Sequence, residues 1–403
     1  MLVSACAKHF VGDGSTLLGV NEGNTISSES QLDQIELPPY IAAIQQNVET
    51  MMVSFSSFNS FKMSGNYHLL TQVLKKQLNF TGLLVSDWQA IDQLPGTINE
   101  QIRHSINAGL DMIMIPTDYK SFLTALKEEV VAGRVPISRI NDAVGKILKL
   151  KENLGLFKNS CAQRSLLNLT GASSTNQIAR EAVAQSLVLL KNENRTAPGS
   201  PIFPLLVKEK TILVAGSHAH NLGLQMGGWS MTWQGAAGNN MTVGTTFLTG
   251  IEEALLNTTT AVTYVETPIG DEVADYGLVF VGEQTYAETK GDNQALQLDG
   301  TSQLAIDNVC SHMPCIVVLI SGRPLEVDYI LPTVDALVAA WFPGTEAGHG
   351  FADVAFGEKD FTGKTAFSWF VQSNQLPMTA DMKPYNPLFP LNFGLNKAGK
   401  PLP

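Results

Sequence analysis

The chain has few cysteines, a deficit of basic residues and no long apolar run. Four cysteines among 403 residues do not make a disulfide-dense scaffold. No stretch approaches the ~20 consecutive apolar residues of a membrane-spanning helix, so no membrane span is expected. The 26 Lys and Arg residues against 37 Asp and Glu give a net charge of −11, which argues against a nucleic-acid partner.

Internal repeats and low-complexity segments are also lacking, and residues 1–7 do not form a signal peptide, because they carry no charged start and are too short. The seven scattered histidines form no ligand cluster, so no metal is expected. What remains is an ordinary soluble composition at a length that allows two domains with cores of their own.

Residues 1–157 alternate between apolar strand patterns and amphipathic helix patterns, which is typical of parallel βα units. Strands are expected at residues 3–10, 51–55, 82–86 and 112–116. Helices are expected at residues 39–48, 67–78, 99–108, 119–132 and 137–154. The spacing suits an eight-fold (β/α) barrel of the TIM type. Such a barrel needs roughly 250 residues, so we expect a partial, truncated barrel, about half of one.

Residues 158–175 are polar and turn-rich and are interpreted as a linker. A second domain over residues 176–378 is expected to open with a helix at 176–189 and to be a doubly wound α/β sandwich. Its strands are expected at 211–215, 262–265, 278–282, 315–320 and 336–340, with helices at 246–256, 302–310 and 347–356. Residues 379–403 form a C-terminal tail that is expected to lie along the surface.

The stretch from Gly82 to Asp92 organises the first domain. A buried strand pattern ends in an acidic residue, Asp87, at the strand end where α/β enzymes carry their chemistry. Trp88 beside it offers a flat face suited to stacking on a sugar ring. The alternative is that Asp87 caps the next helix and Trp88 belongs to the core.

Three further segments are candidates for a site. The acidic loop at 282–293, which contains Glu288, follows a buried strand, although it could be only a solvated loop. Lys8 and His9 end the first strand beside glycines, where a buried polar pair is the alternative. The glycine-bordered loop at 227–235 holds Trp229 and Trp233, and we expect Trp229 to be the ring that anchors the loop internally.

The motifs KHFVGDG, VSDWQAID, GGWSMTWQG and YAETKGDN occur in this order across both domains. In that order they resemble glycoside hydrolase family 3, and the plant-type β-D-glucan exohydrolases and β-glucosidases match best. The resemblance implies an exo-acting, retaining β-glucosidase that releases glucose from the non-reducing ends of β-glucans or β-glucosides. It implies that residues 1–157 are the C-terminal portion of the barrel. It also implies no cofactor and no metal, a monomer if the barrel is complete, and an extracellular or cell-wall location.

The resemblance also implies roles for single residues. Asp87 is implied to be the catalytic nucleophile and Glu288 the acid/base, which makes the interface of the two domains the pocket. Substrate-binding roles are implied for Lys8, His9, Trp88, Trp233 and, on weaker grounds, Glu22. From spacing alone, Cys310 and Cys315 could close a small loop or, less plausibly, bind a metal. The resemblance places a disulfide there.

The chain departs from the family pattern at several positions. An Asp and an Arg that the resemblance places upstream of KHF are absent, Phe55 stands where a Tyr is usual, Gln93 replaces an Arg, and Tyr67-His68 interrupts an Arg-Asp pair. Three interpretations stay open: a fragment of an active enzyme, which we favour, a truncated inactive relative, and a catalytically dead sugar-binding relative. Two other functions are disfavoured. The β-N-acetylhexosaminidase branch of the family lacks the loop that carries Glu288 here. The second domain lacks the GxGxxG turn that dinucleotide binding requires.

The sequence also holds five Asn-X-Ser/Thr acceptors, which support a secreted glycoprotein weakly, because chance yields several in a chain of this length. They are Asn79, Asn168, Asn194, Asn240 and Asn257.

Overall fold

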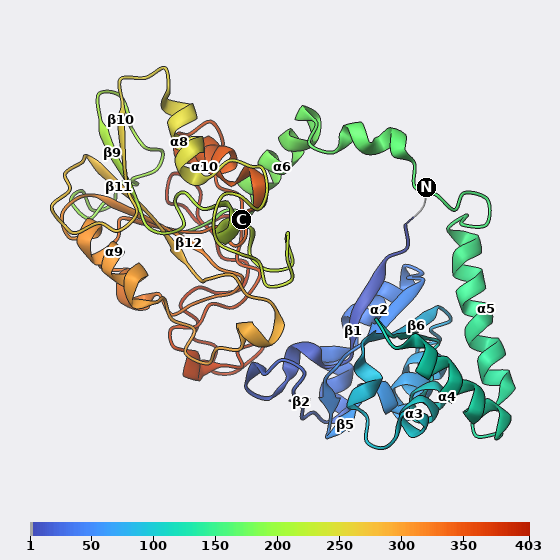
Figure 1. Cartoon of the computed structure of the whole chain (residues 1–403). Coiled ribbons are helices and arrows are strands. Elements are labelled where there is room, and N and C mark those ends of the chain that lie inside the picture. Colours follow the sequence, from blue (N-terminus) through green and yellow to red (C-terminus); the bar gives the residue numbers. More distant parts are fainter. Residues whose placement is uncertain (1–2) are drawn as a thin grey trace. The chain divides into compact units, whose positions relative to one another are not determined.

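The computed structural model describes residues 3–403, and contacts divide the chain into two compact units. The first unit ends at Leu167 and the second begins at Asn168. Figure 1 shows the first unit in blue to green and the second in green to red. In each unit the main sheet has its strands interleaved with helices.

The first unit contains, within the described residues, a four-stranded parallel sheet with the strand order β1-β3-β6-β7. These strands are β1 (Cys6–Phe10), β3 (Thr50–Val53), β6 (Leu83–Trp88) and β7 (Met112–Met114). The helices between and after them are α2 (Pro38–Gln45), η5 (His68–Gln77), α3 (Ile98–Ala108), α4 (Tyr119–Val131) and α5 (Ile137–Asn153). Neighbours in the sequence are therefore neighbours in the sheet, as parallel βα units require.

Three differences from the expected elements have physical causes. The first strand begins at Cys6, because Val3 is exposed and the chain pairs with β3 only from Cys6. The helix at His68–Gln77 is a π-helix, which the apolar spacing does not reveal. Strand β6 runs on to Trp88, since the N–H of Gln89 still donates to the carbonyl of Met114 on β7.

A buried carboxylate joins the helices of the first unit to β6. Asp111 is fully buried and accepts hydrogen bonds from the N–H of Leu84 on β6 at 2.9 Å and from Lys75 on η5 at 3.0 Å. It also pairs with Arg139 and Lys146 of α5. Burial lowers the pKa of Lys75 to about 8, against the opposing effect of Asp111. The cluster fixes α5 and η5 against the sheet.

The second unit has, among the described residues, a six-stranded sheet with the order β10-β9-β11-β12-β13-β8. All neighbours are parallel except β13 and β8. The strands are β8 (Val188–Asn192), β9 (Thr211–Ala215), β10 (Ala261–Val265), β11 (Tyr276–Gly282), β12 (Cys315–Ile320) and β13 (Ala336–Ala339). The helices are α6 (Ser173–Ser186), α7 (Leu222–Met226), α8 (Phe247–Leu255), α9 (Gly300–Cys310) and α10 (Ala347–Ala355).

Successive residues of a strand pack alternately into two separate cores, as expected for a sheet covered on both faces. Val318 on β12 packs with residues of α6, α8 and α10, whereas its neighbour Val317 packs with residues of α9. Helices α8 and α10 cross closely because both carry glycine: a Cβ on Gly250 would lie 2.2 Å from the backbone of Gly348. The α/β class with parallel sheets is therefore confirmed in both units.

The prediction of a helix at 176–189 is wrong about where the helix ends. Helix α6 stops at Ser186, Leu187 is extended, and β8 starts at Val188 as an antiparallel edge strand. The run SLVLLKN is largely apolar, and periodicity cannot separate a buried helix end from a buried strand in so short a run. Helix α6 also starts at Ser173, inside the expected linker.

The tail expected on the surface is partly core. Phe389 is buried, pairs with Trp369 through a backbone bridge and stacks on Phe393 at 5.1 Å between ring centroids. Leu395 bridges to Leu189 of β8. The tail therefore covers the β8 edge and the core beneath it.

The disulfide between Cys310 and Cys315 is confirmed and ties the end of α9 to the start of β12. The two remaining cysteines, Cys6 and Cys161, are free and exposed.

The buried carboxylate of Asp111 gives a stability prediction. Asp111→Asn should destabilise the first unit by about 3–5 kcal/mol, because it leaves buried cations without their counter-charge. Asp142→Asn is the matched control, since Asp142 contacts the same Arg139 and Lys146 but is half exposed. It should stay within about 0.5 kcal/mol of the parent in urea unfolding. Equal effects of the two changes would contradict the structural role of the cluster.

The disulfide gives a second prediction. Replacing Cys310 and Cys315 together by Ala should lower the free energy of unfolding by about 2 kcal/mol, the entropy expected of so short a closed loop. The pair Cys6→Ala and Cys161→Ala serves as control and should leave the unfolding midpoint unchanged. Adding a reductant to the parent protein should reproduce the loss. If neither the double replacement nor the reductant changes the unfolding midpoint, the disulfide does not stabilise the protein.

Candidate active site

The carboxyl ends of β1 and β6 bring His9 and Asp87 together. Nε2 of His9 lies 3.5 Å from Oδ2 of Asp87, although the two residues are far apart in the sequence. Oδ1 of Asp87 accepts the N–H of Trp88 at 2.7 Å, and the Asp87 side chain is 14% exposed. This carboxylate is oriented by two partners and still reachable from solvent. Asp87 caps no helix. The N-cap residue of the short helix that follows is Gln89, and no side chain bonds to that helix end.

The other nitrogen of His9 is held by Asp13, which the sequence analysis missed. Nδ1 of His9 lies 2.9 Å from Oδ2 of Asp13, and Ser54 Oγ donates to Oδ1 of Asp13 at 3.3 Å. The imidazole therefore lies between two carboxylates, hydrogen-bonded to Asp13 and within ion-pair distance of Asp87. The spacing in KHFVGDG, with an Asp four residues after the His, was the available signal.

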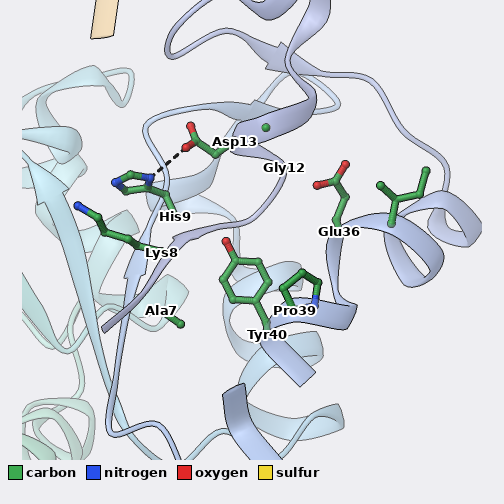
Figure 2. Close-up of a pocket in the computed structure, with 10 residues that line it drawn as sticks. Ala7, Lys8, His9, Gly12, Asp13, Glu36, Pro39 and Tyr40 are labelled. Atoms are coloured by element: carbon green, nitrogen blue, oxygen red, sulfur yellow. Dashed lines mark hydrogen bonds and ion pairs between the residues drawn. The ribbon is translucent and has the colours of Figure 1, made fainter. Parts of the chain in front are cut away.

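Figure 2 shows a pocket at the end of β1, in which the His9–Asp13 pair lies beside Lys8, with Tyr40 and Glu36 opposite. Lys8 is exposed on β1, and Tyr40 lies on α2 with its ring edge-on to Phe10. Burial, with the charges of Asp13 and Glu36, raises the pKa of Tyr40, so its hydroxyl keeps its proton. The pocket wall thus offers an ammonium, an imidazole, carboxylates and a phenol as polar contacts.

Glu22 lies in a second polar group of the first unit. Gln93 joins this group, since its Nε2 donates to Oε2 of Glu22 at 2.6 Å and its Oε1 accepts from Lys62 at 2.7 Å. Lys62 also donates to the carbonyl of Phe55 at 2.9 Å. Burial lowers the pKa of Lys62 although Glu22 opposes this. Phe55 and Gln93, which depart from the family pattern, thus both contact Lys62, a residue that the sequence analysis did not single out.

The aromatic candidates are exposed. Trp88 is 56% exposed at the end of β6, so the alternative that it belongs to the core is wrong. In the second unit Trp233 is 54% and Trp229 is 69% exposed, with ring centroids 6.3 Å apart. The expectation that Trp229 anchors its loop internally is therefore wrong. The loop is closed by its backbone instead, since the N–H of Trp229 donates to the carbonyl of Trp233 at 2.8 Å.

The tryptophan loop contacts the loop that carries Glu288. The N–H of Ala287 donates to Gln234 Oε1 at 2.9 Å, and a Cβ on Gly228 would lie 1.9 Å from the carbonyl oxygen of Tyr286. Only glycine fits at that contact. Glu288 is exposed and begins a short 3-10 helix, η8 (Glu288–Gly291), with a φ of 50°. The second unit therefore brings Trp233 and Glu288 onto adjoining loops.

Two kinds of feature are absent from the described residues. No group of three or more His, Cys, Asp or Glu residues within 3–403 is arranged to hold a metal ion. Over the same residues, no helix has both the length and the apolar character to cross a membrane.

A carboxylate at the end of a parallel strand, an acidic loop and exposed tryptophans are the features that the resemblance to a glycoside hydrolase predicts, and they lie on an α/β fold. Residues 2–150 match the glycosyl hydrolase family 3 N terminal domain, and residues 187–397 match the glycosyl hydrolase family 3 C-terminal domain. The chain belongs to glycosyl hydrolase family 3. The resemblance to this family is confirmed, and so is the fold class of a partial (β/α) barrel followed by an α/β sandwich.

Among the relatives is the lysosomal beta glucosidase of Dictyostelium discoideum, 31% identical over 395 residues, which cover 90% of this chain and 47% of that protein. The periplasmic beta-glucosidase of Salmonella typhimurium is 29% identical over an alignment 436 positions long. The alignment covers 96% of this chain and 55% of that protein. The chain thus spans about half the length of the curated relatives it matches.

Solved structures agree with the assignment to the family. The exo-1,3/1,4-beta-glucanase of a Pseudoalteromonas species has a TM-score of 0.90 at 38% identity, covering 99% of this chain and 51% of that chain. The beta-glucosidase of Listeria innocua in complex with glucose has a TM-score of 0.85 at 27% identity, covering 98% and 57%. The roles of the individual site residues stay predictions.

The contact at Gly228 gives a prediction that is independent of activity. Gly228→Ala should destabilise the second unit by about 1–3 kcal/mol, because the added methyl group forces the two loops apart. Gly300→Ala is the control, since no atom lies within 4 Å of its Cβ position, and it should change the midpoint of thermal unfolding little. A neutral Gly228→Ala would show that the two loops are not in contact.

Proposed function

We propose that the protein is an exo-acting, retaining β-glucosidase or β-glucan exohydrolase, which releases glucose from the non-reducing ends of β-glucans or β-glucosides. The observation that carries this proposal is the carboxylate of Asp87 at the end of β6, oriented by His9 and by the N–H of Trp88. The β-glucosidase and exo-1,3/1,4-beta-glucanase names of relatives in the same family support the substrate class.

In this proposal Asp87 attacks the anomeric carbon of the glucosyl unit and forms a covalent glycosyl ester, while the bond to the leaving oxygen breaks. Glu288 gives its proton to that oxygen and then takes a proton from the water that cleaves the ester. Two inversions at the anomeric carbon leave the β configuration unchanged. The exposure of Glu288 on its loop supports this role, because a proton donor has to reach a bound glycoside.

The same proposal gives binding roles to the polar and aromatic candidates. Lys8 and His9 bind hydroxyls of the glucosyl ring, and the exposed faces of Trp88 and Trp233 stack on the next sugar. The ring exposures support stacking, since large apolar faces left in solvent are typical of binding surfaces. Glu22 has a lesser role, because its carboxylate is already bound to Gln93.

We also propose a secreted, glycosylated protein with an extracellular or cell-wall location, which is a monomer if its barrel is complete. Support comes from the disulfide, which is typical of oxidising compartments. Four of the five glycosylation acceptors are exposed, while Asn194 is half-buried and its side-chain oxygen accepts from Thr196 at 2.7 Å.

The first activity test concerns Asp87. In the full-length protein, Asp87→Ala should lower kcat/KM on an aryl β-glucoside by on the order of 10⁴-fold or more, because no covalent intermediate forms. A 2-deoxy-2-fluoro glucoside should label Asp87 in the parent protein, as seen by mass spectrometry. Asp92→Ala, an exposed carboxylate five residues on, is the control and should retain activity. Turnover at the parental rate in Asp87→Ala would remove Asp87 from this role.

The second activity test concerns Glu288. Glu288→Ala should slow substrates with poor leaving groups by about 10²–10⁴-fold, because they need a proton donor, and activated aryl glucosides far less. Azide should rescue the variant and yield a β-glycosyl azide. Glu252→Ala, an exposed acid on α8, should behave as the parent does. An equal loss on all substrates with no rescue would count against the acid/base role.

A further inference from the structure

We propose that Glu283 and Arg323 are positioning residues that hold the loop around Glu288 in its working conformation. The inference rests on the proposed acid/base role of Glu288. Neither residue was singled out from the sequence, and neither takes part in the bond-making steps described above.

Arg323 connects the start of the loop to its end. Its Nε and Nη2 donate to Oε1 of Glu283 at 3.1 and 2.7 Å, and its Nη1 donates to the carbonyl of Gly291 at 2.6 Å. Glu283 precedes Glu288 and Gly291 follows it, so one guanidinium spans the segment that carries the acid. A planar group with several fixed donors suits this task better than a flexible ammonium does.

The second oxygen of Glu283 is also occupied. Tyr286 donates its hydroxyl to Oε2 at 2.9 Å, and Ser321 donates to the same oxygen at 2.7 Å. The guanidinium of Arg323 lies over the Tyr286 ring, 4.6 Å from its centroid. Burial and the charge of Glu283 raise the pKa of Tyr286, so its hydroxyl remains a donor.

The pair is less exposed than the loop. The side chain of Glu283 is 10% exposed and that of Arg323 is 26% exposed, whereas Glu288 is exposed. Glu283 follows β11, and Ser321 and Arg323 follow the adjacent strand β12. The rigid ends of two paired strands therefore fix this network, and the loop is tied to it on both sides of Glu288.

Close packing adds to the hydrogen bonds. A Cβ on Gly291 would lie 2.7 Å from the Tyr286 ring, so the two ends of the segment touch. A loop tied at one end only would let the carboxyl of Glu288 sample many positions. A displacement of about 1 Å at a reacting group can cost on the order of 10²-fold in rate.

The experiment measures how the rate depends on the leaving group in the full-length protein. Arg323→Met should lower kcat/KM on poor leaving groups by roughly 10–100-fold more than on an activated aryl β-glucoside, which is the pattern of misplaced acid catalysis. Tyr286→Phe, which removes one hydroxyl and keeps the ring, should give a smaller loss with the same pattern. It remains informative if Arg323→Met fails to fold.

Arg195→Met is the matched control. Arg195 follows β8 and donates to the buried Asp335, just before β13, at 3.1 Å and to the carbonyl of Cys310 at 2.8 Å. This is a similar arginine–carboxylate–carbonyl arrangement at the opposite end of the same sheet. Its loss should destabilise the protein without changing the ratio of rates between leaving groups. Hydrogen exchange of the amides at 286–291 should rise in Arg323→Met and stay unchanged in Arg195→Met.

The outcomes separate the two proposals. If Glu288→Ala shows no dependence on the leaving group, the acid/base role fails, and this inference fails with it. If Glu288→Ala shows the dependence while Arg323→Met and Tyr286→Phe do not, only the positioning role is overturned. Unchanged exchange at 286–291 in Arg323→Met would overturn it as well.

Discussion

In this molecule the parallel pairing of the strands determines which functional side chains lie close together. Helical crossovers return each strand to the same direction, so all carboxyl ends of the parallel strands lie at one edge of the sheet. In the first unit this edge brings His9 of β1 and Asp87 of β6 within 3.5 Å. In the second unit the same rule places Glu283 after β11 beside Ser321 after β12, at 2.7 Å. In each unit the polar networks follow from the sheet.

Ion-pair and hydrogen-bond partners then orient these side chains. In the first unit His9 lies between Asp87 and Asp13, so an imidazole lies between two carboxylates. In the second unit Arg323 lies between Glu283 and the carbonyl of Gly291. Both arrangements place a donor with fixed geometry next to a carboxylate. Such donors hold a carboxylate in one orientation, which under the proposed function is the condition for electrostatic catalysis.

Much of this could be predicted from the sequence, because strand and helix patterns repeat over long segments. The buried strands Thr211–Ala215 and Cys315–Ile320 agree with the expected ranges residue for residue. Strand β8 was missed because its short apolar run is ambiguous. Lys62, Glu283 and Arg323 were missed because their roles come from partners distant in the chain, which no local pattern encodes. Asp13 was missed although its position four residues after His9 was a local signal.

The pairing of β8 with the C-terminal tail affects how the second unit folds during synthesis. Leu189 lies near the start of this unit, yet it bridges to Leu395, and Asn192 donates to the carbonyl of Lys397 at 2.9 Å. During synthesis on the ribosome, the edge of β8 therefore emerges long before the segment that covers it. An uncovered edge strand is a template for wrong pairing. Nascent chains of this protein should therefore depend on chaperones until the tail is released.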